Sequence, residues 1–242
     1  MFGAMRRAYT GDFVVSGLSP ERPDFSHIEG WLFDLDNTLY PHGSAVLLEA
    51  ESRIGCFIEE QFRLSKDEAR RLQKECLAKS GSTLAGLIER FAIDPEPYLA
   101  FVNDVDVTTL ARAPELKAAL VGLPGKRAVF TNNCAHYAAR VLEQLGIAEC
   151  FDAICDIRTI GFAAKPTPSA YRAVVSRIGI APQHCAMFED AERNLAPAHA
   201  LGMTTVWLQD HRADRLALPS HVHHDTDDLV GFLQSIKVRT PS

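Results

Sequence analysis

The amino-acid sequence predicts an α/β protein built on a doubly wound parallel sheet, with an all-helical block inserted after the first strand. Three observations support this fold class. Short apolar runs alternate with helical patterns from residue 114 onward. Residues 31–33 form an apolar run without polar alternation, as expected for a strand covered on both faces. Residues 41–112 contain helical patterns and no convincing strand, so this block interrupts the sheet-forming part of the chain.

The overall composition is that of an ordinary soluble globular protein. The chain has 242 residues, enough for one good core and a second small module, and is 47% hydrophobic and 23% charged. A formal net charge of −6 argues against nucleic acid or an anionic membrane as a partner. No apolar run approaches the length of a transmembrane helix. We therefore expect neither nucleic acid nor a membrane among its partners.

The cysteines and the N-terminal segment suggest where the protein works. Six cysteines are spread irregularly, without a C-x-x-C pair. This spacing predicts reduced, apolar side chains in a cytoplasmic protein, not a disulfide framework or a zinc site. Residues 1–25 lack the hydrophobic core of a signal peptide, so we expect a loosely ordered extension there.

The inserted block is predicted to contain four helices. Apolar side chains recur with helical spacing over residues 44–62. Ser65 and Glu68 form a capping box that opens a second helix, which runs to about residue 78. Residues 82–91 and 95–102 are predicted to form the third and fourth helices.

The rest of the chain alternates between strands and helices, as parallel sheets require. Strands are predicted after the first one at 127–130, 151–154, 185–188 and 203–208, with an edge strand at 221–224. Helices are predicted at 114–122, 136–145, 168–179, 191–201 and 227–236. Gly146 and Gly179 stand where two of these helices should end.

Two acidic residues, Asp34 and Asp36, directly follow the first strand. Buried carboxylates are unfavourable unless they are paired or bind a metal. Two of them so close together favour a bound cation, or different protonation states for the two groups. Taken alone, the pair is equally compatible with a polar turn, so its interpretation depends on residues further along the chain.

Further polar residues follow other strands of the predicted sheet. Thr131 and Asn132 follow the second strand, Glu189 and Asp190 follow a later one, and Lys165 lies in a proline-flanked loop. Each alone has an ordinary alternative; Asp190 could cap a helix and Lys165 could be a surface lysine. Ligands bind at the carboxyl ends of parallel strands, however, and these residues converge on that edge. The sequence therefore predicts one shared site.

These motifs resemble those of the haloacid dehalogenase (HAD) superfamily, over essentially the whole chain from about residue 30. The motifs occur in the family's order as Asp34-Leu35-Asp36-Asn37-Thr38, Thr131-Asn132, Lys165-Pro166, and Glu189-Asp190 followed by Asn194. Each is weak alone, but the set with this spacing is specific. The resemblance implies a Rossmann-like core. Dehalogenases of the superfamily lack the second aspartate of the first motif, so Asp36 makes the resemblance point to phosphoryl chemistry.

The resemblance implies catalytic and metal-binding roles for the acidic residues. Asp34 would be the nucleophile that forms an aspartyl-phosphate, and Asp36 the general acid and base. Mg²⁺ would be held by the Asp34 side chain, the Asp36 backbone carbonyl and the Asp190 carboxylate. Glu189 would act through a water or from behind these ligands.

The remaining motif residues are implied to bind the phosphoryl group. The Thr131 hydroxyl and the Asn132 backbone amide would hold its oxygens, and Lys165 would offset its charge and that of the nucleophile. Asn194 would support the acidic residues. Cys134 is interpreted as a small loop residue, because nothing in the sequence supplies a base for it.

The position of the helical block corresponds to the C1 cap of the superfamily. Only about 30 residues lie between Asn132 and Lys165, too few for a C2 cap domain. The predicted organisation is an extension at 1–25, a core at 26–40 and 113–238, and the cap at 41–112.

Within the superfamily, the cap resembles the pyrimidine 5'-nucleotidase branch. The resemblance rests on Leu39-Tyr40-Pro41, on Gly81-Ser82-Thr83-Leu84-Ala85-Gly86-Leu87, and on Ile93-Asp94-Pro95 with Tyr98-Leu99. Two positions depart from the pattern of that branch. Ser82 replaces a threonine, and Asn103 stands where a histidine is common, so both changes are expected to bear on substrate choice.

The function that this resemblance implies is Mg²⁺-dependent hydrolysis of phosphomonoesters, with nucleoside 5'-monophosphates, preferably pyrimidine, as substrates. The protein is expected to act as a monomer or homodimer. Three alternatives stay open at this stage: a phosphatase for another small ester such as a phosphosugar or phosphoglycolate, a phosphomutase, and a catalytically idle module that binds phosphate or a partner.

Overall fold

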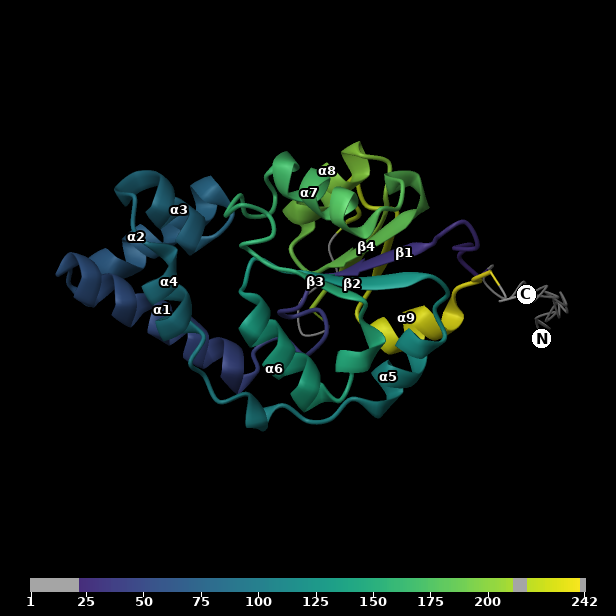
Figure 1. Cartoon of the computed structure of the whole chain (residues 1–242), viewed down its shortest axis with the longest axis horizontal. Coiled ribbons are helices and arrows are strands. Elements are labelled where there is room, and N and C mark those ends of the chain that lie inside the picture. Colours follow the sequence, from purple (N-terminus) through teal and green to yellow (C-terminus); the bar gives the residue numbers. More distant parts are fainter. Residues whose placement is uncertain (1–21, 211–216, 240–242) are drawn as a thin grey trace, which may run out of the picture.

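The computed structural model describes residues 22–210 and 217–239, which contain a six-stranded parallel sheet (Figure 1). The strands are β1 (Gly30–Phe33), β2 (Lys126–Phe130), β3 (Ala153–Cys155), β4 (Cys185–Glu189), β5 (Thr204–Leu208) and β6 (His224–Thr226). Their order in the sheet is β3-β2-β1-β4-β5-β6, and every neighbouring pair is parallel. The predicted α/β fold class is confirmed.

The first strand lies in the middle of the sheet, between β2 and β4. All its residues are buried, which explains why the sequence shows no polar alternation there. The Phe33 ring stacks on Phe188 of β4 with ring centroids 4.7 Å apart. The Trp31 indole nitrogen donates a hydrogen bond of 2.6 Å to the Pro124 carbonyl, so its polar group is satisfied inside the core.

Helices cover both faces of the sheet. They are α5 (Pro114–Val121), α6 (Ala135–Leu145), α7 (Pro168–Ile178), α8 (Leu195–Ala200) and α9 (Leu229–Ser235). In Figure 1, α7 and α8 lie on one side of the sheet, and α5, α6 and α9 lie on the other. This is the doubly wound arrangement that the alternation of strands and helices predicts.

The two elements that differ most from the sequence-based prediction are α8 and β6. The helix predicted at 191–201 begins late, because Glu192–Asn194 form a 3₁₀ turn and α8 starts only at Leu195. The edge strand predicted at 221–224 lies instead at His224–Thr226. Its predicted residues contact the Thr205 side chain, which donates to the His221 carbonyl (2.8 Å) and accepts from the His223 amide (3.1 Å), so most of them do not join the ladder.

The inserted block forms the four predicted helices, α1 (Ala45–Phe62), α2 (Lys66–Ser80), α3 (Thr83–Phe91) and α4 (Pro95–Val102), followed by a 3₁₀ turn at Val107–Thr109. Residues 41–112, all of them described, contain no strand. The capping box of Ser65 and Glu68 is present. The four helices pack against one another and lie to one side of the sheet in Figure 1.

Two glycines of the block allow close backbone approaches. A Cβ on Gly86 of α3 would lie 2.4 Å from the Cβ of Cys76, so only glycine lets α3 approach α2 this closely. Gly81 ends α2 with φ of 78°, and a Cβ there would lie 2.1 Å from the Lys165 carbonyl oxygen. Gly81 is thus a point where the helical block touches the core loop that carries Lys165.

The first and last described segments of the chain pack together, with a backbone bridge between Asp24 and Lys237. The Phe25 side chain is fully buried and packs against Trp31 and Phe232. The Arg22 guanidinium donates to backbone carbonyls at the end of α9, including that of Ile236 at 2.9 Å. Most of the extension predicted at 1–25 lies outside the described residues, but residues 22–25 belong to the packed fold.

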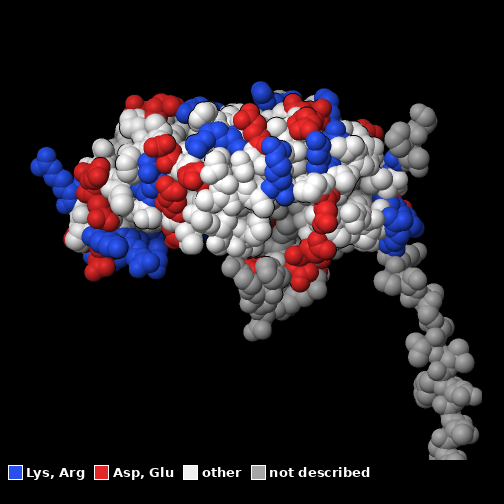
Figure 2. Space-filling view, turned by 90° about the horizontal axis from the view of Figure 1, so that it is seen from below, with Lys and Arg blue, Asp and Glu red and all other residues white. Residues whose placement is uncertain are grey.

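Three further observations concern the described residues. None of their helices combines the length and apolar character needed to cross a membrane. All six cysteines are free thiols. On the face seen in Figure 2, Lys and Arg side chains alternate with Asp and Glu side chains.

Candidate active site

A buried lysine joins two of the predicted acidic residues at the carboxyl edge of the sheet. The Lys165 ammonium donates to the Asp34 carboxylate (2.6 Å), the Glu189 carboxylate (2.7 Å) and the Phe130 carbonyl (2.8 Å). Lys165 and Glu189 are each 1% exposed. Asp34 directly follows β1 and Glu189 ends β4, and these strands are neighbours, so the sheet order brings the two carboxylates together. The prediction that these motifs converge is confirmed in the structure.

Burial dominates the electrostatics of this cluster. Burial and repulsion from Glu189 raise the pKa of Asp34 to about 8, against the attraction of Lys165. Burial also raises the pKa of Glu189 to about 7 and, together with repulsion from Asp34, that of Asp190 to about 6. Burial opposes the charge on Lys165, but attraction to Asp34 and Glu189 outweighs it and raises the pKa of the ammonium. Lys165 therefore stays charged, while the nearby carboxyl groups ionise less readily than usual because they are buried and repel one another.

The cluster has the chemistry of a site for a hard divalent cation. Asp34, Glu189 and Asp190 each offer a carboxylate oxygen, and these oxygens lie within 4.8 Å of one another. When all three carboxyls are ionised, they exceed the single Lys165 ammonium by two negative charges, which one divalent ion would balance. Oxygen ligands of this kind suit Mg²⁺. The residues present therefore fit the expected metal.

The predicted set of metal ligands differs from this geometric group, which contains Glu189 and lacks Asp36. Glu189 belongs to the group, yet one of its oxygens pairs with Lys165 and the other accepts from the Ala191 amide at 3.2 Å. Glu189 is thus held by the protein itself, and its expected position behind the metal ligands stays a prediction. Asp190 does not cap the following helix, because the 3₁₀ turn intervenes. The Asp36 carboxylate is outside the group, and the predicted ligand from Asp36 is its backbone carbonyl.

The Asp36 carboxylate is held by two tyrosines and an asparagine. The Tyr40 hydroxyl donates to it, and the Tyr137 hydroxyl donates to the same oxygen at 3.2 Å. The Asn133 amide lies 3.5 Å from the other oxygen. Burial raises the pKa of Asp36, while these hydrogen bonds work in the opposite direction. A raised pKa makes the carboxyl group easier to protonate, which is the direction that a general acid needs.

Sequence reasoning missed these two tyrosines as parts of the site. Tyr40 follows Asp36 by four residues, a spacing that could have suggested the contact. Tyr137 lies on α6, 101 residues from Asp36, and no local pattern connects the two. The two hydroxyls are 2.8 Å apart and so position each other.

The second motif is tied to the third through a side chain. The Asn132 side chain accepts from the Lys165 amide (2.7 Å) and donates to the Lys165 carbonyl (3.3 Å). The Thr131 hydroxyl is fully buried and accepts a hydrogen bond of 3.0 Å from the backbone amide of Asn133. Asn132 was predicted to act through its backbone amide. Its side chain, in addition, holds the loop that positions Lys165 through these two hydrogen bonds. The predicted phosphoryl contacts of Thr131 and Asn132 stay predictions.

Three further residues from the sequence analysis lie near the site. Asn194 is buried, and within the described residues its side-chain oxygen has no hydrogen-bond partner. Cys134 is buried at the start of α6, where the Asn103 amide lies 3.5 Å from its sulfur. Asn103 also donates to the Leu99 carbonyl at 3.0 Å, so this departure from the nucleotidase pattern is packed inside the fold.

A cavity of about 450 Å³ connects the motif loops with the helical block. From the core edge it is lined by Asp36, Asn37, Asn132 and Asn133. From the helical block it is lined by Gly43, Leu47, Leu48, Ala50, Glu51, Ile54, Gln73, Leu77, Gly81, Ser82, Thr83, Leu84, Tyr98, Leu99 and Val102. Part of the stretch that resembles nucleotidases therefore lines a cavity that opens onto Asp36.

Comparison with known proteins places this site in a family. A family model described as haloacid dehalogenase-like hydrolase matches residues 28–202. Phosphate metabolism protein 8 of Saccharomyces cerevisiae is 30% identical over 189 residues, 72% of this chain, and the match spans 59% of the yeast protein. A glyceraldehyde 3-phosphate phosphatase of Methanopyrus kandleri is 27% identical over 197 residues, covering 75% of this chain and 84% of that protein.

The fold has relatives among solved structures as well. The crystal structure of a HAD phosphatase from Thermococcus onnurineus superposes with a TM-score of 0.57 at 22% identity, covering 86% of this chain and 99% of that one. The family match covers most of the chain and includes the first, second, third and fourth motifs. This chain belongs to the haloacid dehalogenase-like hydrolases.

Proposed function

We propose that this protein is a Mg²⁺-dependent phosphomonoester hydrolase of the HAD superfamily, with residues 41–112 as a C1 cap over the catalytic edge of the sheet. One observation carries the proposal. Lys165 is fully buried between Asp34 and Glu189, next to an Asp36 carboxylate that two tyrosine hydroxyls hold in place. So much buried charge is unfavourable in a core with only a structural role. It suits a site that stabilises the charge on a phosphoryl group during its transfer.

The proposed reaction gives each of these side chains one role. The Asp34 carboxylate attacks phosphorus, the bond to the leaving oxygen breaks, and Asp36 gives that oxygen its proton. Asp36 then takes a proton from a water that attacks the aspartyl-phosphate, so phosphate leaves and Asp34 is regenerated. Lys165, Thr131 and the Asn132 amide stabilise charge on the phosphoryl oxygens.

The metal's contribution is electrostatic. Bound by Asp34, the Asp36 carbonyl and Asp190, with Glu189 behind them, Mg²⁺ would neutralise the acidic cluster and the phosphate. It would thereby favour the ionised form of the Asp34 nucleophile, which burial alone disfavours.

The proposed substrates are nucleoside 5'-monophosphates, with pyrimidine nucleotides preferred. The cavity supports this proposal because apolar side chains of the cap, including Leu47, Ile54 and Leu84, offer a surface for a flat base. The residues Gly81 to Leu84, from the stretch that resembles nucleotidases, contribute to the same wall. The second candidate is a small phosphosugar, which the name of the archaeal relative favours.

A substrate panel tests this function. Phosphate release would be measured from UMP, CMP, dTMP, AMP, GMP, phosphoglycolate and several sugar phosphates, each with Mg²⁺ or EDTA. We expect Mg²⁺-dependent release that is fastest with UMP or CMP. Release confined to sugar phosphates or phosphoglycolate would retain the chemistry and reject the nucleotidase. Transfer without net release would indicate a mutase, and Mg²⁺ binding without turnover an idle binding module. A cytoplasmic location and a monomeric or homodimeric state complete the proposal.

A further inference from the structure

We propose that the cap cavity selects phosphoesters whose leaving group carries no second anion, and that Glu51 of α1 is the residue that rejects one. This inference rests on the proposed phosphatase function and specifies its substrate class. Glu51 lies on the cavity wall formed by the cap and is not one of the motif residues.

The charge of the cavity wall is the first argument. Among the described residues that line the cavity, the charged ones are Asp36 and Glu51, both acidic. Its lining contains no Lys, Arg or His side chain in the described part of the chain. Lys165, the cation of the catalytic edge, is engaged with Asp34 and Glu189. A second phosphate in this cavity would therefore lose water and meet carboxylates instead of a cation.

The shape and polarity of the wall are the second argument. Aliphatic side chains form much of the cap side: Leu47, Leu48, Ile54, Leu77, Leu84, Leu99 and Val102. Two of them, Leu48 and Leu77, are 59% and 41% exposed, so the wall presents apolar surface that a neutral leaving group can cover. The cavity thus suits an uncharged leaving group with an apolar face.

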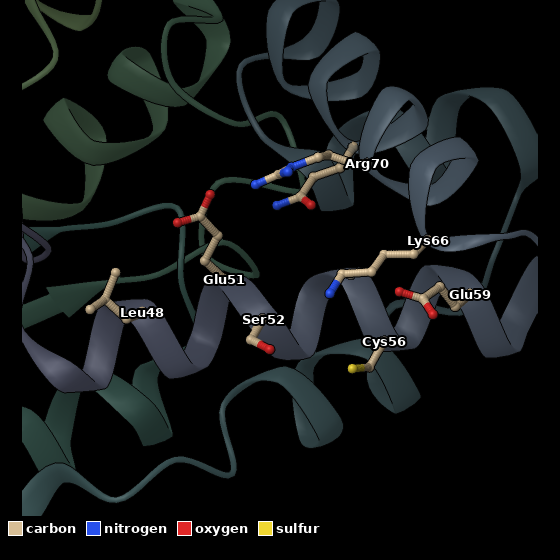
Figure 3. A pocket seen from close by; sticks show the side chains of 9 residues that line it. Leu48, Glu51, Ser52, Cys56, Glu59, Lys66 and Arg70 are labelled. Atoms are coloured by element: carbon tan, nitrogen blue, oxygen red, sulfur yellow. The ribbon is translucent and has the colours of Figure 1, made fainter.

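The position of Glu51 is the third argument. A second pocket lies between α1 and α2, and it shares Leu48, Glu51 and Gln73 with the cavity. Its cations are Lys66 and Arg70, for which the described residues provide no ion pair. Figure 3 shows Glu51 of α1 and Arg70 of α2 reaching into the same space. Glu51 therefore lies where the cavity adjoins the pocket whose cations could otherwise attract a distal anion.

Matched pairs of substrates isolate the effect of a second phosphate. The first pair is UMP and uridine 3',5'-bisphosphate, and the second is ribose 5-phosphate and ribose 1,5-bisphosphate. With saturating Mg²⁺, we expect the second phosphate to lower kcat/KM about tenfold or more in both pairs. In Glu51→Gln the ratio should shrink several-fold, because the repulsion is removed while the side chain keeps its size. Glu60→Gln is the matched control, since it removes an exposed carboxylate of α1 that lines neither pocket.

The outcomes separate this inference from the proposed function. Equal kcat/KM within both pairs, or an unchanged ratio in Glu51→Gln, would overturn the inference while leaving the phosphatase intact. A preference for bisphosphates that disappears in Arg70→Gln would also overturn it, by showing that the second pocket captures a distal anion. If no ester releases phosphate, the phosphatase proposal fails. Titration calorimetry of the same pairs with the Mg²⁺-loaded protein would then decide whether the second phosphate weakens binding as we expect.

Discussion

At the residue scale, the site depends on how its buried charged side chains are paired. The motif residues alone indicate which acids and which lysine are present, but their pairing depends on the sheet order. Asp34, Lys165 and Glu189 could be predicted as a group because parallel strands deliver their carboxyl ends to one edge. The hydrogen bonds from Tyr137 to Asp36 and from Asn132 to the Lys165 backbone could not, since each joins residues far apart in sequence through side-chain packing.

Tyr137→Phe should slow catalysis by weakening the support of Asp36. The change removes a donor from the Asp36 carboxylate and the hydroxyl that contacts the Tyr40 hydroxyl, so the general acid is less well positioned. We expect kcat to fall roughly tenfold or more, with a much smaller change in KM. Steady-state kinetics on the preferred ester measures both constants. Thermal unfolding serves as the control, because loss of the contacts of this buried hydroxyl should lower stability by only about 1–3 kcal/mol. An unchanged kcat would show that Tyr137 has no positioning role.

At the element scale, local signals decide how well boundaries are predicted. The four helices of the inserted block were located within two residues at each end, because prolines, a capping box and an N-cap serine mark them. The start of α8 and the position of β6 were missed. In both places side-chain to backbone contacts compete with regular structure, through Glu189 at the first and Thr205 at the second.

Gly81→Ala should disturb the contact between the cap and the Lys165 loop. The new Cβ would lie 2.1 Å from the Lys165 carbonyl oxygen, in addition to the strain of alanine at φ of 78°. Gly179→Ala is a matched control, because Gly179 also ends a helix at positive φ (68°) but has nothing within 4 Å of the added Cβ. The control should lose about 1 kcal/mol of stability and keep its activity.

For Gly81→Ala we expect a larger loss of stability and a clear fall in kcat/KM. Denaturant unfolding and steady-state kinetics of the two variants measure the difference. Equal effects in the two variants would mean that the close approach of Gly81 to the core loop affects neither stability nor kcat/KM.

At the scale of the whole molecule, the buried acidic cluster couples stability to pH. Asp34, Glu189 and Asp190 have raised pKa values of about 8, 7 and 6 in the folded protein. In the unfolded chain these carboxyls ionise near their ordinary pKa of about 4. Between pH 4 and 8 the folded state therefore binds more protons than the unfolded state, and its stability falls as pH rises.

Without a metal, the melting temperature should thus decrease from pH 6 to pH 8. Mg²⁺ should raise it and reduce this decrease, because the ion stabilises the ionised carboxylates. Thermal unfolding in EDTA and in Mg²⁺ across that range measures the effect, and Asp34→Asn, which removes one of the three acids, should show a shallower slope in EDTA. A melting temperature in EDTA that rises over this range would contradict the assignment of the buried acidic cluster.

The sequence predicts the two-part organisation of the molecule better than its substrate. Parallel-sheet rules and helix signals place the catalytic edge and the inserted block, and the structure joins them through a cavity that both line. On our proposal, substrate choice depends on the side chains of that cavity, such as Glu51 on α1 and Gln73 on α2, which line it together only in the folded protein. Two positions in the stretch from Gly81 to Leu87 have a physical explanation, since close backbone approaches require glycine at Gly81 and Gly86.

The central claim is that Asp34 is a nucleophile that carries the phosphoryl group. Acid quenching during turnover with Mg²⁺, followed by mass spectrometry of the peptides, tests it most directly. We expect a phosphoryl group on the peptide that contains Asp34, and neither this adduct nor turnover in Asp34→Asn. Steady phosphate release without such an adduct would contradict the mechanism. Phosphate release by Asp34→Asn at the parent rate would contradict it as well.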